Sequence, residues 1–277
     1  MLSPRVDLAE RCRKSIANRG MTMKKILLAA AFAAFSALSA QAADKLVIGT
    51  EGAYPPFNFI DAAGKVGGFD VDIGLALCAE MKVECEVVTQ DWDGIIPALQ
   101  AKKFDFMIAS MFITPERAEK VAFTKAYYKA PMTHIAPKGA GITEFTNEAL
   151  KGKVIGAQAG TTQAEYAKVT YPDADLKLYP TQDEVNLDMI NGRLDLEVGD
   201  MLPMMAWLNT EDGKCCELIG KPIGDEKWIG KGAGIAVRLE DKELLAKLNA
   251  AIDAIRANGT YQKINAKYFP IDVYDMK

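Results

Sequence analysis

Residues 104–117 read Phe-Asp-Phe-Met-Ile-Ala-Ser-Met-Phe-Ile-Thr-Pro-Glu-Arg, and this stretch sets the pattern of the whole chain. The apolar run at 104–108 is typical of a buried strand, while Thr114 and Pro115 predict the N-cap and first turn of a helix. The loop between them offers free backbone amides, a serine hydroxyl and the nearby guanidinium of Arg117. Such a strand-to-helix junction suits a small anion, for example a carboxylate.

The same alternation of strand and helix extends on both sides of this stretch. Upstream it predicts strands at 45–50 and 85–89 and helices at 68–81 and from 92 onward. Downstream, a second unit repeats the pattern, with strands at 153–157, 176–179, 194–198 and 232–237 and helices at 164–169, 183–191, 201–208, 241–258 and 261–269. Alternating strands and helices indicate an α/β fold with parallel sheets. Polar residues follow the strand ends in both units, where such sheets bind ligands.

Composition sets the class of protein. The chain has 277 residues, of which 25% are charged and 49% hydrophobic, which suits one or two globular domains. Without residues 1–42, which carry seven of the 33 basic and two of the 37 acidic side chains, the net charge is near −9. An acidic chain without a basic patch is a poor nucleic-acid binder, so we expect no nucleic-acid partner.

The N-terminus has the three parts of a secretory signal peptide. A basic Met-Lys-Lys at 23–25 precedes an apolar stretch at 26–38 and the small residues Ala40-Gln41-Ala42. We expect cleavage after Ala42 and treat residues 1–42 as a leader, with 1–22 an over-long start-site assignment. A transmembrane anchor is the competing interpretation, but the apolar core is short and a cleavage site follows it.

Four cysteines remain after the leader. Cys78 and Cys85 are predicted at a helix end and the next strand start, where a disulfide would close a short loop. The adjacent Cys215 and Cys216 leave open a vicinal disulfide, two free thiols or an intermolecular link. We expect no metal site, because the chain has one histidine, His134, and no second cysteine pair at ligand spacing.

Several stretches together resemble a known family. The most specific is Gly-Phe-Asp-Val-Asp-Ile-Gly-Leu-Ala-Leu-Cys-Ala-Glu-Met at 68–81, and the supporting stretches are 110–117, 122–128, 160–163 and 259–261. They resemble the periplasmic amino-acid-binding proteins of ABC transporters, bacterial solute-binding protein family 3, which includes lysine/arginine/ornithine-, histidine- and opine-binding proteins. The resemblance covers residues 45–274.

The resemblance implies a two-lobed periplasmic-binding-protein fold of type II, in which helices flank a mainly parallel sheet in each lobe. Residues 43–130 and 232–277 would form lobe 1 and residues 131–231 lobe 2, joined by two hinge strands near 129–132 and 226–232. The implied function is capture of a small molecule by hinge closure and its delivery to the membrane permease of an ABC transporter. We expect a periplasmic monomer without a cofactor.

The resemblance also implies how an α-amino acid would be held. Arg117 would bind the α-carboxylate, helped by backbone amides near Phe112 and at Thr162, while Ser110 and Asp200 would bind the α-ammonium. Each role has physical sense, because an unpaired charge in a dry cleft costs several kcal/mol.

The side-chain end of the ligand would meet Glu51, between the aromatic rings of Tyr54 and Trp92. A carboxylate beside two rings suits a cationic group, since a guanidinium stacks on aromatic faces while its N–H groups bind the acid. We therefore favour arginine, lysine, ornithine, or an arginine-derived opine such as octopine or nopaline. The alternative is that Glu51 is a loop acid that never contacts the ligand.

Three positions depart from the family pattern. Phe112 and Ala109 stand where basic-amino-acid binders usually have hydroxyl residues, and Gln158 stands where an apolar residue is common. The loss of a hydroxyl weakens the carboxylate site unless backbone amides suffice, and Gln158 offers a hydrogen bond to a larger ligand. These departures raise the opine hypothesis.

Two other functions compete. Some relatives on this fold are exported cyclohexadienyl dehydratases, in which a cleft acid such as Glu51 or Asp200 would donate a proton. The sequence shows no nucleophile–base pair and no cofactor loop, and Asp200 is the partner that an ammonium needs. We therefore expect a binding protein rather than an enzyme. A receptor's sensory domain is the third hypothesis, and the chain shows no signalling region.

Overall fold

Two five-stranded sheets with helices on both faces make up the part of the chain that the structure describes. This structure is a computed structural model, and it describes residues 45–274 and 276. The predicted leader and signal peptide, residues 1–42, lie outside the described residues. The described residues belong to one compact body.

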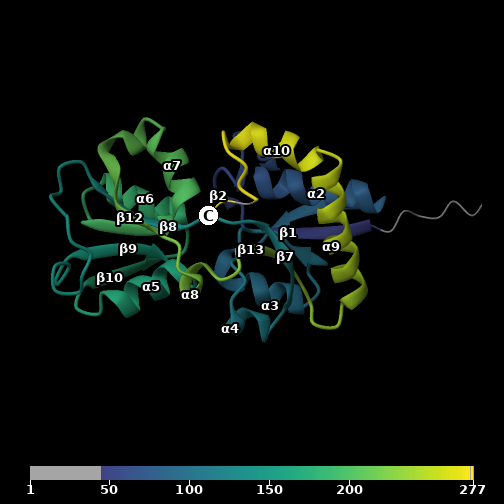
Figure 1. Ribbon diagram of the computed structural model, residues 1–277, viewed down its shortest axis with the longest axis horizontal. Helices are drawn as coiled ribbons and strands as arrows, with labels where there is room; N and C mark the ends of the chain where they lie inside the picture. The colour runs from purple at the N-terminus through teal and green to yellow at the C-terminus, as the bar shows by residue number, and fades with distance from the viewer. Residues whose placement is uncertain (1–44, 275, 277) are drawn as a thin grey trace, which may run out of the picture. The chain divides into compact units, whose positions relative to one another are not determined.

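The first sheet has the order β5-β1-β6-β13-β7. Its strands are β1 (Lys45–Thr50), β5 (Glu84–Thr89), β6 (Phe106–Met107), β7 (Ala122–Tyr128) and β13 (Ala233–Val237). β5, β1 and β6 run parallel, and β13 runs antiparallel to both of its neighbours. One face carries α2 (Phe69–Met81), α9 (Lys242–Ala257) and α10 (Thr260–Tyr268). The other face carries α3 (Ile95–Gln100), which follows the short 3₁₀ helix η1 (Trp92–Gly94) (Figure 1).

The second sheet repeats this plan in the order β10-β9-β11-β8-β12. Its strands are β8 (Met132–Pro137), β9 (Val154–Gln158), β10 (Asp175–Tyr179), β11 (Leu196–Asp200) and β12 (Cys216–Ile223). Here β8 is the strand that runs antiparallel to its neighbours. α5 (Thr162–Thr170) packs on one face, while α6 (Gln182–Ile190) and α7 (Met201–Leu208) pack on the other (Figure 1).

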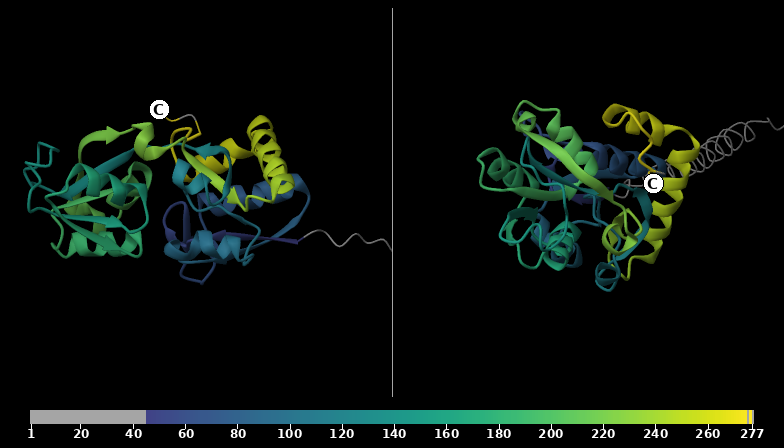
Figure 2. Two further views of the ribbon diagram at one scale, coloured as in Figure 1. Left: turned by 90° about the horizontal axis from the view of Figure 1, so that it is seen from below. Right: turned by 60° about the vertical axis from the view of Figure 1, so that its left-hand side comes forward.

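Shorter elements complete the chain. An antiparallel sheet of β2 (Ala53–Tyr54), β3 (Asn58–Ile60) and β4 (Val66–Gly67) lies between β1 and α2. The remaining short helices are α4 (Pro115–Ala118), η2 (Asp212–Cys215) and α8 (Glu226–Ile229). In the turned views, the yellow helices α9 and α10 lie beside the blue α2, so the C-terminus returns to the first sheet (Figure 2).

The chain passes between the two sheets twice, from β7 to β8 through residues 129–131 and from β12 to β13 through residues 224–232. The predicted two-lobed α/β fold is therefore confirmed. Three strands, β7, β8 and β12, were not predicted from the sequence. β8 and β13, each the antiparallel strand of its sheet, begin directly after a crossing, and only the four-residue helix α8 lies in either crossing, so no long crossover helix marks a parallel strand there.

Threonine N-caps explain why helices begin where the strands end. Thr114 accepts a hydrogen bond from the backbone N–H of Arg117 at 3.3 Å, as the sequence predicted. Thr161 caps α5 through Ala164 N–H at 3.1 Å, and Thr181 caps α6 in the same way. A side-chain cap satisfies one of the orphan donors of the first turn. These caps fix the loops in which the polar residues of both units lie.

The structure joins Cys78 to Cys85 in a disulfide, with the two Cα atoms 6.2 Å apart. Cys215 is exposed and Cys216 buried, and both are free thiols. Among the described residues, no helix combines the length and the apolar character needed to span a bilayer.

We expect the disulfide to stabilise the first sheet's unit by restricting the unfolded chain. In the double variant Cys78→Ser/Cys85→Ser, the free energy of unfolding should fall by about 2 to 3 kcal/mol, measured by urea denaturation. Cys215→Ser is the control and should change it by less than about 0.5 kcal/mol. Equal stability of the double variant and the parent would contradict this prediction.

Candidate functional site

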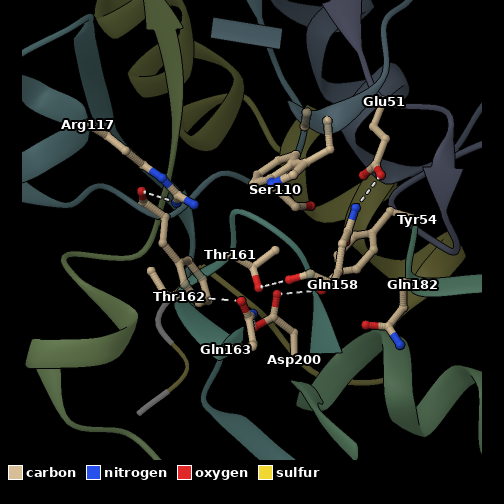
Figure 3. A pocket seen from close by; sticks show the side chains of 13 residues that line it. Glu51, Tyr54, Ser110, Arg117, Gln158, Thr161, Thr162, Gln163, Gln182 and Asp200 are labelled. Atoms are coloured by element: carbon tan, nitrogen blue, oxygen red, sulfur yellow. Dashed lines mark hydrogen bonds between the residues drawn. The ribbon is translucent and has the colours of Figure 1, made fainter. Parts of the chain in front are cut away.

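Thirteen residues from the strand ends and helix starts of both sheets line one pocket (Figure 3). They are Glu51, Tyr54, Trp92, Ala109, Ser110, Phe112, Arg117, Gln158, Thr161, Thr162, Gln163, Gln182 and Asp200. All ten of the predicted ligand-binding residues are among them. Their binding roles remain predictions, while their convergence on one pocket is a property of the fold.

A buried carboxylate behind the pocket holds its first wall in place. Asp70, in the first turn of α2, accepts hydrogen bonds from Asn58 Nδ2 at 2.9 Å, Ser110 Oγ at 3.0 Å and Tyr127 OH at 2.6 Å. Burial raises the pKa of Asp70 to about 6, and these three bonds oppose the rise. Because Ser110 donates its proton to Asp70, its oxygen lone pairs are left to accept a donor from the pocket.

Ser110 also has an unusual backbone. Its φ is +53°, in the left-handed region that residues other than glycine rarely adopt. The backbone N–H of Ser110 donates to Tyr127 OH at 3.1 Å, and this bond helps to hold the strained conformation. The strain turns the chain sharply between β6 and α4, at the wall of the pocket.

Asp200 is the acid of the second sheet. It ends β11 with 3% of its surface exposed, and it accepts hydrogen bonds from Tyr54 OH at 2.6 Å and from Gln163 Nε2. No lysine or arginine in the described residues forms an ion pair with it. Burial raises the pKa of Asp200 to about 6. A buried carboxylate with only neutral donors is a favourable partner for a ligand cation.

Glu51 is the second buried acid of the pocket that has only a neutral partner. It has 7% of its surface exposed and accepts a hydrogen bond from Gln158 Nε2 at 2.6 Å. Burial raises its pKa to about 7, and the charge of nearby Asp183 adds to the rise. Gln158 Nε2 also donates to the backbone oxygen of Pro180 at 3.1 Å, so both of its hydrogens are used.

Arg117 supplies the cation of the pocket. Its guanidinium donates to the backbone oxygens of Phe112 at 2.9 Å and Gly160 at 3.1 Å, and its Cζ lies 5.4 Å from the ring centre of Trp92. Burial lowers the pKa of Arg117 to about 10, so it stays charged at neutral pH. Two of its five N–H groups are engaged by these bonds.

The remaining predicted residues, Phe112, Ala109 and Thr162, have different surroundings. Phe112 is buried in the core of the first sheet and orients Arg117 through its backbone oxygen. Ala109 is buried at the end of β6 and packs with α3. Thr162, at the start of α5, is half-buried, with its hydroxyl 3.3 Å from Gln163 Oε1.

Four residues of functional interest were not singled out from the sequence: Asp70, Thr161, Gln163 and Gln182. Gln163 and Gln182 each follow a threonine cap after a strand, which is the signal that identified Arg117. Asp70 lies inside the motif at 68–81, but its partners are 12 to 57 residues away in the sequence. Within residues 45–274, no three His, Cys, Asp or Glu side chains are grouped to hold a metal ion.

Comparison with known proteins gives consistent matches along the chain. The sequence profile of bacterial extracellular solute-binding proteins, family 3, matches residues 46–271. The L-arginine-binding protein of Pseudomonas aeruginosa is 46% identical over 257 residues, 91% of this chain and 99% of the relative. The ABC transporter arginine-binding protein 1 of Escherichia coli is 40% identical over 248 residues, 90% and 100% of the two chains.

A solved structure is also similar to this chain. A periplasmic binding protein of Salmonella typhimurium, described for its high arginine specificity, matches with a TM-score of 0.75 and 36% identity. The match covers 81% of this chain and 99% of that one.

We expect Asp70→Ala to destabilise the protein, because it leaves the donors of Asn58, Ser110 and Tyr127 without an acceptor. The free energy of unfolding should fall by about 3 kcal/mol, measured by urea denaturation without ligand. Glu80→Ala, an exposed acid of the same helix, is the control and should change it by less than about 0.5 kcal/mol. A small effect of Asp70→Ala would show that the three bonds are dispensable.

Proposed function

Because the chain belongs to the bacterial extracellular solute-binding proteins, family 3, we propose that it captures a cationic amino acid, arginine foremost, for an ABC importer. The pocket of thirteen residues would hold the ligand, and the membrane permease would receive it. The relatives named above are binding proteins. One is named an L-arginine-binding protein, and another is named an arginine-binding protein of an ABC transporter. We infer a periplasmic location with export by the predicted signal peptide.

The charge of the pocket carries the proposal. Glu51 and Asp200 are buried carboxylates whose hydrogen-bond donors are all neutral, and Arg117, the one cation among the lining residues, acts on Asp200 through its charge without an ion pair. A zwitterion with a cationic side chain brings two positive charges and one negative charge. It therefore complements two acids and one arginine, whereas a neutral amino acid would leave one buried carboxylate without a counter-charge.

Each end of the ligand has a matching group. Arg117 keeps three N–H groups for the α-carboxylate, and Asp200 and Ser110 have lone pairs for the α-ammonium. Glu51 would meet the side-chain end beside Tyr54 and Trp92. Arginine suits this end because its planar guanidinium binds a carboxylate and stacks on a ring.

Opine ligands receive less support. An opine carries a further carboxylate, which needs a hydrogen-bond donor. Both hydrogens of Gln158 Nε2 are bound to Glu51 and Pro180, so this amide has no free donor to offer. We therefore favour free arginine, with lysine and ornithine as weaker ligands.

The two crossings between the sheets support closure of the cleft. We propose that residues 43–130 with 232–277 and residues 131–231 form the two lobes and that they close over the ligand about the two crossings. The bonds of Tyr54 to Asp200 and of Arg117 to Gly160 link residues that fall in different lobes on this division. The protein would act as a monomer.

An enzyme of the cyclohexadienyl dehydratase type is the alternative. Glu51, with its pKa near 7, is the group that could donate a proton there. The binding-protein relatives favour capture over turnover.

Titration calorimetry with arginine, lysine, histidine, octopine and nopaline, alongside an assay of prephenate turnover, tests this proposal. We expect arginine to bind most tightly and prephenate to remain unchanged. Arg117→Ala should weaken binding of every α-amino acid by about 100-fold or more, because it removes a buried charged partner of the carboxylate. Arg193→Ala, on the exposed surface of the second sheet's unit, is the control and should bind normally. Clear turnover, or no binding of any cationic ligand, would refute the proposal.

Binding of arginine should depend on pH through Glu51. Its pKa is raised from 4.5 to about 7 in the ligand-free pocket, and a bound cation favours the ionised carboxylate, so binding releases a proton. Affinity should therefore level off above about pH 7 and fall below it by up to about tenfold per pH unit. Asp200 adds to the fall below about pH 6.

In Glu51→Gln the part of this dependence above pH 6 should disappear, and arginine affinity at pH 8 should fall by about tenfold or more. Calorimetry at pH 6 and pH 8 measures both quantities, with Glu80→Gln as the matched control. Unchanged arginine affinity in Glu51→Gln would remove the basis for cation selection.

A further inference from the structure

Gln182 is held from behind by two buried side chains. It is the first residue of α6, lines the pocket and has 4% of its surface exposed. Its Nε2 donates to Asn186 Oδ1 at 3.1 Å and to Glu197 Oε1. Asn186 and Glu197 are 6% and 0% exposed, and neither lines the pocket. An amide nitrogen has two hydrogens, so both are used.

This arrangement fixes which end of the amide faces the ligand. With Nε2 turned to Asn186 and Glu197, the Oε1 atom of Gln182 is turned toward the other pocket side chains (Figure 3). No donor to this oxygen is found in the described part of the chain. Rotation of the amide by 180° would place Oε1 against Asn186 Oδ1 as well as Glu197 Oε1, the two acceptors that now bind Nε2, which is unfavourable. Gln182 therefore presents an acceptor to the pocket and no donor.

The orientation does not require Glu197 to be ionised. Burial raises the pKa of Glu197 to about 8, and its Oε2 has no hydrogen-bond partner. A protonated carboxyl group with its hydrogen on Oε2 still has Oε1 as a carbonyl acceptor. The bond from Gln182 Nε2 to Glu197 Oε1 is therefore available in both protonation states.

The start of α6 lies close to the predicted side-chain end of the ligand. The backbone oxygen of Pro180, two residues before Gln182, accepts from the amide of Gln158 that also binds Glu51. The charge of Asp183, the next residue after Gln182, reaches Glu51 strongly enough to affect its ionisation. Gln182 and Glu51 are thus two acceptors at the same end of the pocket.

We propose that Gln182, oriented by Glu197 and Asn186, is a specificity-determining residue that selects ligands whose side-chain end carries only hydrogen-bond donors. This inference rests on the proposed function and adds a second selector to Glu51. A guanidinium offers N–H groups alone. Its neutral isostere, the urea group of citrulline, places a carbonyl oxygen in the same volume, and that oxygen would face the lone pairs of Gln182 and Glu51. A buried site rejects an analogue that leaves its polar groups unpaired.

Arginine and citrulline, which have the same length and shape, are the probes. Their dissociation constants should be measured by calorimetry for the wild-type protein, Gln182→Leu and Glu197→Gln. We expect the preference for arginine over citrulline to fall by about tenfold in Gln182→Leu, which removes the acceptor. In Glu197→Gln the new amide group at 197 offers donors as well as an acceptor, so Gln182 can turn over. The preference should fall there mainly because citrulline binds more tightly.

Asp195→Asn is the matched control, because it makes the same change from carboxylate to amide two residues before Glu197. Asp195 binds Val154 N and Lys153 Nζ outside the pocket, so the preference should stay at the wild-type value. A purely structural role of Glu197 would lower the melting temperature and weaken both ligands alike, leaving their ratio unchanged.

The outcomes separate this inference from the proposed function. Arginine binding that depends on Arg117, with an unchanged ratio in Glu197→Gln and in Gln182→Leu, would overturn the role of Gln182 alone. If Gln182→Leu does not fold, the ratio in Glu197→Gln decides. Equal wild-type affinities for arginine and citrulline would also overturn the inference, and failure to bind any cationic amino acid would refute both proposals.

Discussion

Asp70 accepts hydrogen bonds from Asn58, Ser110 and Tyr127 inside the first sheet's unit, and the geometry of one pocket wall depends on this buried carboxylate. Through Asn58, whose Oδ1 accepts from Gly52 N at 2.7 Å, the same network reaches the loop that carries Glu51. Through Ser110, it holds the left-handed turn that leads to Arg117. A buried charge is stable only when its lone pairs are satisfied, so these segments are fixed together.

The two acids that line the pocket differ from Asp70, because each could still accept a positively charged partner. These acids, Glu51 and Asp200, are hydrogen-bonded to neutral donors, and burial raises the pKa of both. Neutral donors reduce the cost of burial but do not replace a counter-charge. On the proposed function, a cationic zwitterion would supply that counter-charge at both acids, so that ligand binding and closure would have the same electrostatic cause.

Local signals account for much of what the sequence predicted. The threonine cap at the start of α4, the apolar runs at β1, β9 and β11, and the glycine-led motif at 68–81 each act within a few residues. The resemblance supplied the roles of the ten predicted site residues. The roles of Asp70 and Gln182 could not be predicted, because the hydrogen bonds that define them join residues 12 to 57 positions apart for Asp70 and 15 positions apart for Gln182 and Glu197. In the sequence Gln182 is an ordinary first-turn residue, whereas in the structure Glu197, on a strand of the second sheet, and Asn186 each accept one of its amide hydrogens.

The succession of strands and helices, the polar residues at their junctions and the candidate cysteine pair could be predicted without the structure, because they follow from periodicity, capping and short spacing. The antiparallel course of β8 and β13, the hydrogen bonds that hold Ser110 and Gln182, and the direction in which each amide points are visible only in the folded chain. These features depend on polar groups that are far apart in the chain. Such groups must be hydrogen-bonded to each other only once folding has buried them away from water.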